Sequence, residues 1–381
     1  MVTRELRHAI ARAVAAAGYP HATDPGLRPA GTPGRYAASV ALSLGANPRE
    51  AAETIAVSLA REPWIATAEV TGPGFVTVTV TPGALAAVAD NVTEAGPACV
   101  TSDALAGRTV PAALAGEPLA APTWEAARSA LAARLTVRLA AAAGATVTDI
   151  RDPERVRVPR EALPDAGTGP ARSRGGRGGR GGASPREATA YAGRDAVTFT
   201  LARAVPGKVL RVDPEEIARH VLGNPAYAVR YAYARAASGM RWAAVSPAAD
   251  TIGVAEASVL LDALSWLPER VATAARRGRP DEFARYLEDL ASVTVDVLTS
   301  DREARSGKMY AAQGAGSNPS GADEAGPSFG EAKGGAPGRE SPSWPAGRVQ
   351  RLSLAKAART GLAAGLSLLE VGAPERLLAE R

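Results

Sequence analysis

Apolar positions in the first fifty residues recur at helical spacing. Three- and four-residue intervals separate Leu6, Ile10, Val14 and Ala17, which predicts an amphipathic helix near the start of the chain. We expect a second helix to begin near Arg35. A further helix should begin after Asn47, because Asn47 can cap it, a proline follows at the first helical position, and Glu50 stands three residues after the cap.

The spacing changes to that of strands over the next thirty residues. Residues 65–70 and 75–80 predict two strands, joined by a Thr-Gly-Pro-Gly turn at 71–74. Valines at 76, 78 and 80 alternate with Thr77 and Thr79, which is typical of a half-buried strand. Together with the helices before them, these strands indicate a small α+β unit over residues 1–95.

Helical patterns dominate the remainder of the chain. We predict one helix over 124–143, a short strand over 145–150, a mostly helical region over 186–299 and a closing helix over 351–369. The fold class is therefore mainly α, with a small α+β N-terminal domain and a C-terminal helical bundle. Residues 96–165 carry the weakest pattern.

Two segments have compositions that do not favour a packed element. Residues 166–186 include GTGPARSRGGRGGRGGASP, and residues 311–347 are rich in Gly, Pro and Ser. Glycine entropy and repulsion between arginines oppose packing. We expect a flexible linker at 166–186, a helical domain over 187–381 and a disordered insertion near 311–347 within that domain.

Composition excludes several classes of protein. The 381-residue chain is 46% hydrophobic and has a net charge of +5, so it can bury a core and accept an anionic partner. One cysteine excludes an internal disulfide, and three histidines make a zinc cluster improbable. We expect no metal and no cofactor. Without a signal peptide or a long apolar run, the expectation is a cytoplasmic protein with no membrane partner.

Aromatic and basic residues concentrate in one stretch, Asn224–Trp242, although the chain is only 4% aromatic. Asn224 and Pro225 predict the start of a helix. Helical spacing then divides the stretch into two faces. Val229, Tyr233, Ala236 and Met240 form one face; the other carries Tyr227, Arg230, Tyr231, Ala234, Arg235, Arg241 and Trp242.

The second face has two interpretations. Rings and guanidinium planes together can stack on unpaired RNA bases and bind phosphate. Tyrosines at helical spacing also pack bundle cores, with the hydroxyl reaching a partner. We expect Arg230, Arg241 and Trp242 to be its more exposed members and Tyr231 and Arg235 its more buried ones. His220, a lone histidine, is interpreted as structural.

Several motifs occur in the order found in arginyl-tRNA synthetases. GRYAASVA (34–41), NPREAAETIA (47–56) and VTGPGFVTVTV (70–80) resemble the N-terminal additional domain of that family. GRDAVTF (193–199), NPAYAVRYAYARAA (224–237), RYLEDLA (285–291) and the region 352–377 are similar to its DALR anticodon-binding domain. The resemblance implies tRNA, including an arginine-accepting one, as partner, with an aminoacyl-tRNA synthetase as a further partner.

The centre of the chain departs from that family. The resemblance would require a His-x-Gly-His element, yet no histidine lies between His21 and His220, and no KMSK-type loop stands in the matching place. Residues 96–165 are similar at most to a remnant of the catalytic domain. We therefore predict a non-catalytic paralogue that binds tRNA. The alternatives are a residual arginine-tRNA ligase and a protein-interaction module without RNA binding.

Two more candidate sites accompany the aromatic stretch. In the family, an aromatic and a polar residue of the second strand face tRNA, which implies contacts from Phe75 and Thr77, although a threonine replaces the family's asparagine. The arginines of the glycine-rich linker, Arg174 and Arg177 among them, can bind RNA through charge and stacking. The alternatives are an ordinary sheet position and a solubilising linker.

Overall fold

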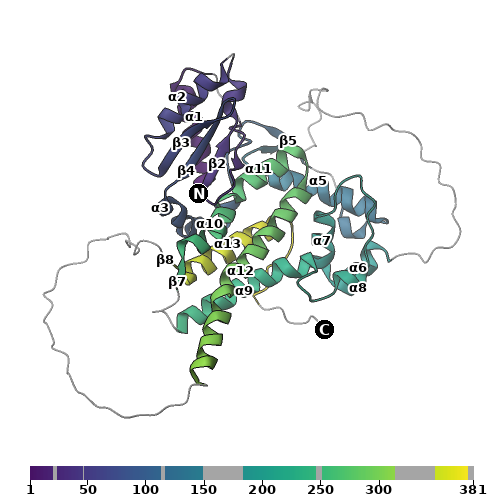
Figure 1. The fold of residues 1–381 in the computed structure, drawn as a ribbon. Helices are drawn as coiled ribbons and strands as arrows, with labels where there is room; N and C mark the ends of the chain where they lie inside the picture. Colours follow the sequence, from purple (N-terminus) through teal and green to yellow (C-terminus); the bar gives the residue numbers. More distant parts are fainter. Residues whose placement is uncertain are drawn as a thin grey trace, which may run out of the picture.

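The computed structural model describes residues 1–19, 24–45, 47–112, 116–148, 183–245, 251–313 and 348–375, with the side chains of 242–245, 300–313 and 348 excepted. Its N-terminal part is a four-stranded antiparallel sheet of order β1-β2-β4-β3 with two longer helices (Figure 1). The elements are α1 (Val2–Ala16), β1 (Arg28–Pro29), β2 (Arg35–Ala38), α2 (Pro48–Leu59), β3 (Ile65–Thr71) and β4 (Phe75–Val80).

The helix predicted near Arg35 is wrong. Arg35–Ala38 form strand β2, which pairs with β4 so that Tyr36 lies opposite Val78, and only a short 3₁₀ helix, Val40–Ser43, follows. The apolar residues of this stretch satisfy either period locally. Pairing with β4 selects the strand, because the backbone groups of β4 otherwise lack partners on that side.

Two of the resembling motifs meet where α2 begins. Asn47 caps α2 by accepting a hydrogen bond from the Glu50 amide at 3.4 Å, as the sequence predicts. Gly74, in the turn between β3 and β4, has a φ of +143°, and a β-carbon there would lie 2.9 Å from Pro48 Cβ. Glycine at this turn thus lets the helix start and the hairpin turn touch.

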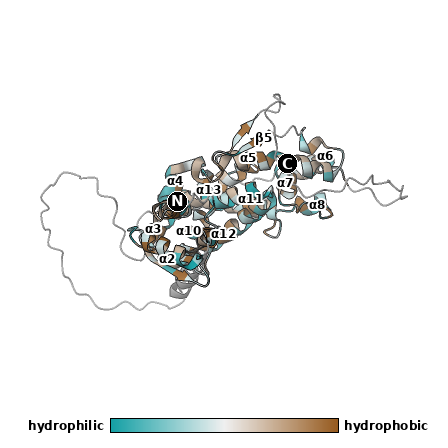
Figure 2. Ribbon diagram, turned by 90° about the horizontal axis from the view of Figure 1, so that it is seen from above, coloured by the Kyte–Doolittle hydropathy of each residue, from teal (hydrophilic) through white to brown (hydrophobic). Residues whose placement is uncertain are grey.

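A helical bundle makes up most of the remaining described residues. The predicted helix over 124–143 is confirmed as α5. The helices are α3 (Pro82–Ala86), α4 (Val88–Ala95), α5 (Trp124–Ala142), α6 (Pro185–Ala192), α7 (Arg194–Ala202), α8 (Pro214–Ile217), α9 (Pro225–Val245), α10 (Val254–Ser265), α11 (Leu267–Arg277), α12 (Pro280–Gln313) and α13 (Arg351–Leu368). Seen from above, α2 and α3 lie at one end of the described part and α6 and α8 at the other (Figure 2).

Short strand pairs and 3₁₀ helices join the bundle. The strands β5 (Thr109–Pro111) and β6 (Thr146–Thr148) pair in parallel, and β7 (Thr251–Gly253) and β8 (Arg348–Gln350) pair antiparallel. Further 3₁₀ helices are Gly96–Val100 and Pro118–Ala120. The strand predicted over 145–150 is thus present as β6, and its last two residues lie outside the described part.

The N-terminal sheet unit and the bundle share one hydrophobic core. Their buried apolar side chains form a single cluster, in which Tyr36 of β2 lies against Trp266 with ring centroids 5.5 Å apart. The Tyr36 hydroxyl donates to Asp262 Oδ1 at 2.7 Å, and the Gly34 amide donates to the same oxygen at 3.1 Å. Residues from one resembling motif therefore anchor the sheet to the bundle.

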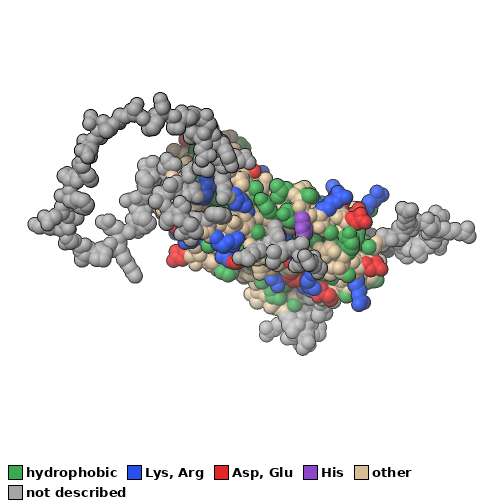
Figure 3. Space-filling view, turned by 90° about the horizontal axis from the view of Figure 1, so that it is seen from below, with side chains coloured by type: hydrophobic (Ala, Val, Ile, Leu, Met, Phe, Trp, Pro, Cys, Tyr) green, Lys and Arg blue, Asp and Glu red, His purple; other side chains and the backbone are tan. Residues whose placement is uncertain are grey.

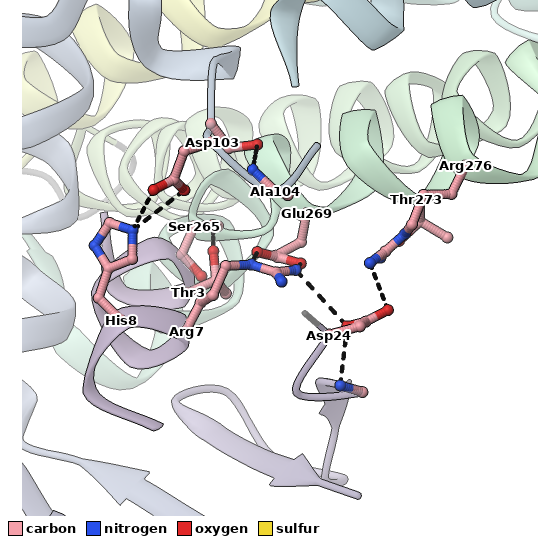
Figure 4. Close-up of polar contacts among 12 residues, drawn as sticks. Thr3, Arg7, His8, Asp24, Asp103, Ala104, Ser265, Glu269, Thr273 and Arg276 are labelled. Carbon is pink, nitrogen blue, oxygen red and sulfur yellow. Dashed lines mark hydrogen bonds and ion pairs between the residues drawn. The ribbon is translucent and has the colours of Figure 1, made fainter. Parts of the chain in front are cut away.

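Polar contacts of α1 extend this seam (Figure 4). Arg7 Nε donates to Glu269 Oε1 at 2.7 Å, and the Arg7 side chain is only 7% exposed. Thr3 Oγ1 donates to the Ser265 carbonyl. His8 Nε2 lies 3.0 Å from Asp103 Oδ2, and this contact keeps the pKa of Asp103 below its usual range although partial burial acts to raise it.

Candidate nucleic-acid interface

The start of α9 is held to the segment before it by Asn224. This buried side chain donates from Nδ2 to the carbonyls of Ile217 and Arg219, both at 2.8 Å, and its Oδ1 accepts from the Ala226 amide at 3.2 Å. A capping side chain that also binds two carbonyls fixes the turn between α8 and α9. His220, which lies in that turn, is thereby placed beside the first turns of α9.

Three rings stack along this end of α9. The His220 ring lies 5.3 Å from the Tyr227 ring at an interplanar angle of 15°, and Tyr227 lies 5.9 Å from Tyr231 at 24°. His220 is exposed, whereas the two tyrosines are half-buried. Offset stacking at these separations is favourable. The result is a column of three stacked rings, His220–Tyr227–Tyr231, whose His220 end is exposed to solvent.

The opposite face of α9 is the core face. Val229 and Ala236 are fully buried and Tyr233 is nearly so, in a helix that packs on α12, α13 and α7. Tyr233 lies beneath the guanidinium of Arg359 of α13, 5.7 Å from its ring centroid. Tyr233 therefore packs in the core. Tyr227 and Tyr231, for which core packing was the alternative interpretation, lie on the other side of the helix and are half-buried.

The predicted cations of α9 differ in exposure. Arg241 is exposed and Arg235 is half-buried. The expectation of an exposed Arg230 is wrong: its side chain is 19% exposed and lies 3.7 Å from Asp195 of α7. Asp195 belongs to the GRDAVTF motif, so the two resembling motifs of the bundle contact each other. The side chain of Trp242 lies outside the described residues.

The two candidate residues in the sheet, Phe75 and Thr77, also differ in exposure. Phe75 is half-buried at the start of β4, beside the hairpin turn. Thr77 is only 6% exposed and its hydroxyl lies 3.0 Å from that of Thr71, so the half-buried alternation predicted for this strand is wrong at Thr77. Its hydroxyl is already engaged within the hairpin. Arg174 and Arg177 lie outside the described residues.

His220 is the residue that sequence interpretation missed. A lone histidine seven residues before the first tyrosine gives no periodic signal, because it is not in the helix. The sequence signal that bears on His220 is the capping pair Asn224-Pro225, which predicts a helix start and therefore a turn just after His220. The face seen from below shows hydrophobic side chains around a histidine, with both basic and acidic side chains at the margins (Figure 3). Val221 and Leu222, next to His220, are exposed apolar residues.

Among the described residues, no group of three or more His, Cys, Asp or Glu side chains is arranged to hold a metal ion. No helix of the described part is both long and apolar enough to cross a bilayer. What the α9 region offers is planar stacking surface and guanidinium groups rather than an acid–base pair.

Comparison with known proteins bears out the resemblance of the N-terminal motifs. Residues 4–80 match the family described as the arginyl tRNA synthetase N-terminal domain. An arginine–tRNA ligase of Bifidobacterium longum subsp. infantis is 32% identical over 203 residues, which cover 49% of this chain and 28% of the relative. The enzyme of Frankia alni is 32% identical over 193 residues, covering 49% of this chain and 29% of the relative.

The fold has a counterpart among solved structures. The arginyl-tRNA synthetase of Thermus thermophilus superposes with a TM-score of 0.61 at 16% identity, over 98% of this chain and 100% of that one. In sequence, however, the matches span less than a third of the length of the curated relatives. The chain is thus arginyl-tRNA synthetase-like in its N-terminal sequence and in its fold.

Proposed function

We propose that this protein is a non-catalytic arginyl-tRNA synthetase paralogue that binds tRNA. The observation that carries the proposal is the ring column His220–Tyr227–Tyr231 at the solvent end of α9, beside Arg235. The likeness to arginine–tRNA ligases supplies the class of nucleic acid. In this proposal the bundle is of the DALR anticodon-binding type, and α9 is its RNA-contacting helix.

The column fits single-stranded bases better than a duplex. An unstacked base can continue the stack on the exposed His220 ring, and stacking on an aromatic side chain contributes about 1–3 kcal/mol per base. Anticodon-loop bases are splayed and available for such stacking. The half-buried tyrosines are rigid, so little side-chain entropy is lost when a base binds.

A second contact comes from the sheet unit. Phe75 is half-buried beside the hairpin turn, and the sheet unit lies at the end of the molecule away from α8 (Figure 1). The shared core fixes the separation between Phe75 and the ring column. A rigid, two-ended surface suits a folded RNA that is long enough to reach both ends. Thr77 is not part of this contact because it is buried.

The absence of ligase activity rests on the sequence between the two resembling regions. A class I centre holds ATP phosphates with a His-x-Gly-His element, and no histidine lies between His21 and His220. Such a centre needs preorganised hydrogen-bond donors at the phosphates to stabilise the transition state. The protein therefore serves to carry, regulate or deliver tRNA.

The test is binding of the purified protein to a panel of individual tRNAs at two salt concentrations. We expect salt-sensitive binding, because phosphate contacts release counterions, together with a preference for arginine isoacceptors. Uniform weak binding to every tRNA would reduce the surface to a nonspecific basic one. Failure to bind any tRNA at low salt would contradict the proposal, and arginine-dependent ATP–pyrophosphate exchange would contradict its non-catalytic part.

A further inference from the structure

A cleft of about 350 Å³ lies at the seam between the sheet unit and the bundle, apart from the α9 column. One wall is the segment Asp24–Pro29, and the other is α11 with the residue before it, Trp266. Figure 4 shows part of this wall, with Asp24 facing Glu269 and Arg276. Nothing in the proposed RNA contact uses the cleft.

Arg270 is the central cation of the cleft. Its guanidinium lies 5.4 Å from the ring centroid of Trp266 and 5.5 Å from that of Tyr286. Ring contacts orient a guanidinium plane but leave its N–H edges unused. Among the described residues, Arg270 Nε has no hydrogen-bond partner. The Trp266 side chain, only 5% exposed, interacts with Asp262, and the charge of Arg270 acts on the same carboxylate. Both residues line the cleft and present donors only.

The acidic side chains of the cleft are already engaged. Asp24 pairs with Arg276, Glu269 with Arg7, and Glu282 lies 3.1 Å from Arg277. No salt bridge to a described carboxylate involves Arg28, which is exposed on one wall, or Arg270 on the other. Burial lowers the pKa of Arg276, and the positive charge of the neighbouring Arg7 lowers it further. The negative charge of Asp24 acts to raise this pKa but does not outweigh them. Positive charge is therefore in excess.

We propose that this cleft binds a phosphate group, held between Arg270 and Arg28. A planar guanidinium fixed by two rings matches the oxygens of a phosphate in a two-point contact. A volume of about 350 Å³ exceeds that of inorganic phosphate, so the cleft has room for a phosphate group carried by a larger molecule. The phosphate source is either a free nucleoside phosphate or an RNA backbone. Only the RNA case rests on the function proposed above.

The direct test follows the indole N–H signal of Trp266 by NMR, assigned with Trp266→Phe, while inorganic phosphate is added to the full chain. We expect a saturable shift of that signal. Arg270→Gln should weaken phosphate binding about tenfold or more, since hydrogen bonds to charged groups are strong. Arg28→Gln should weaken it as well, and it removes no packed side chain. Arg61→Gln, an exposed arginine away from the cleft, is the charge-matched control.

Two further titrations distinguish the sources. Tighter binding of AMP than of inorganic phosphate identifies a nucleoside phosphate, whereas a shift with tRNA that Arg28→Gln weakens identifies a backbone phosphate. Either result supports the proposal that the cleft binds a phosphate group. If phosphate, AMP and tRNA all leave the Trp266 signal unchanged, the cleft proposal is overturned, even if tRNA binds elsewhere. If no tRNA binds but phosphate shifts Trp266, the cleft stands and the RNA proposal fails.

Discussion

The guanidinium of Arg7 in α1 and the carboxylate of Glu269 in α11 form a buried two-point ion pair between residues 262 positions apart. Burial acts to lower the pKa of Arg7, but the hydrogen bond and charge of Glu269 outweigh it and raise that pKa. The pair is therefore matched, and removing Arg7 would leave the Glu269 carboxylate as a buried charge without this partner. It fixes the first helix of the sheet unit to the bundle.

Arg7→Leu should lower the free energy of unfolding by about 3–5 kcal/mol, because it strands the buried Glu269 carboxylate. The double variant Arg7→Met/Glu269→Leu should recover most of this loss. Urea unfolding measures both. Arg12 lies in the same helix as Arg7 and forms a more exposed ion pair with Glu62. Arg12→Ala, which breaks that pair, should lower the free energy of unfolding by no more than about 1 kcal/mol. Equal losses for Arg7→Leu and Arg12→Ala would show that the seam is open in solution.

Tyr36→Phe should cost about 1.5–3 kcal/mol at pH 7, since its hydroxyl donates to the charged Asp262. Burial raises the pKa of Asp262, so the folded state holds this proton to higher pH than the unfolded state. The stability contribution of Asp262 is thus largest in acid and falls as pH rises above about 4.

The cost of Tyr36→Phe should therefore be larger at pH 7 than at about pH 3, which lies below even the unshifted pKa of an aspartate, so that Asp262 is protonated. Chemical unfolding at the two pH values measures the difference. Tyr191→Phe, at an exposed tyrosine, is the control and should be neutral at both. A pH-independent cost for Tyr36→Phe would mean that Asp262 is not charged at neutral pH in the folded protein.

Cys99 should not react with a thiol reagent while the chain is folded. Burial raises its pKa to about 12, against about 8.5 for a free cysteine. Because only the unfolded thiol ionises between these values, stability should decline as pH rises above about 8.5. The rate of disulfide exchange at pH 8 should follow the unfolded fraction across a urea titration. Rapid reaction without urea would place Cys99 at the surface.

Gly365→Ala should destabilise the bundle by about 1–3 kcal/mol through overpacking. An added β-carbon would lie 2.5 Å from Leu287 Cδ2, where α13 approaches α12. Gly239→Ala is the matched change in α9, because its β-carbon would lie 3.6 Å from Ala355 Cβ, an ordinary contact. That variant should gain up to about 1 kcal/mol from helix propensity. Thermal unfolding that shows a gain for both would contradict the close α12–α13 contact.

Tyr231→Leu should weaken tRNA binding by about 1–3 kcal/mol, because it removes one ring of the column but keeps an apolar side chain. Arg241→Gln should reduce the salt dependence of binding by about one phosphate contact. Filter binding at several salt concentrations measures both effects. Tyr191 is an exposed tyrosine of α6, and the Tyr191→Leu variant should bind tRNA as tightly as the unchanged protein does. If Tyr191→Leu weakens binding as much as Tyr231→Leu, the column is not the RNA contact.

Local signals predicted several elements correctly. Asn47 caps α2 and Asn224 caps α9, because a cap is a hydrogen bond between residues two or three positions apart. Helix α5 was predicted to within a residue from its pattern. The prediction was wrong at Arg35–Ala38, since these residues form a strand by pairing with β4, whose residues are 38 to 44 positions further along the chain.

The sequence by itself determined which residues share a face of α9, because a period of 3.6 places Val229, Tyr233 and Ala236 together regardless of what covers them. Only the tertiary structure decided that His220 completes the ring column, that Arg230 lies beside Asp195, and that Tyr286 of α12 lies against Arg270 of α11. These contacts join residues on different elements. Their geometry follows from how the elements pack, and no local period encodes it.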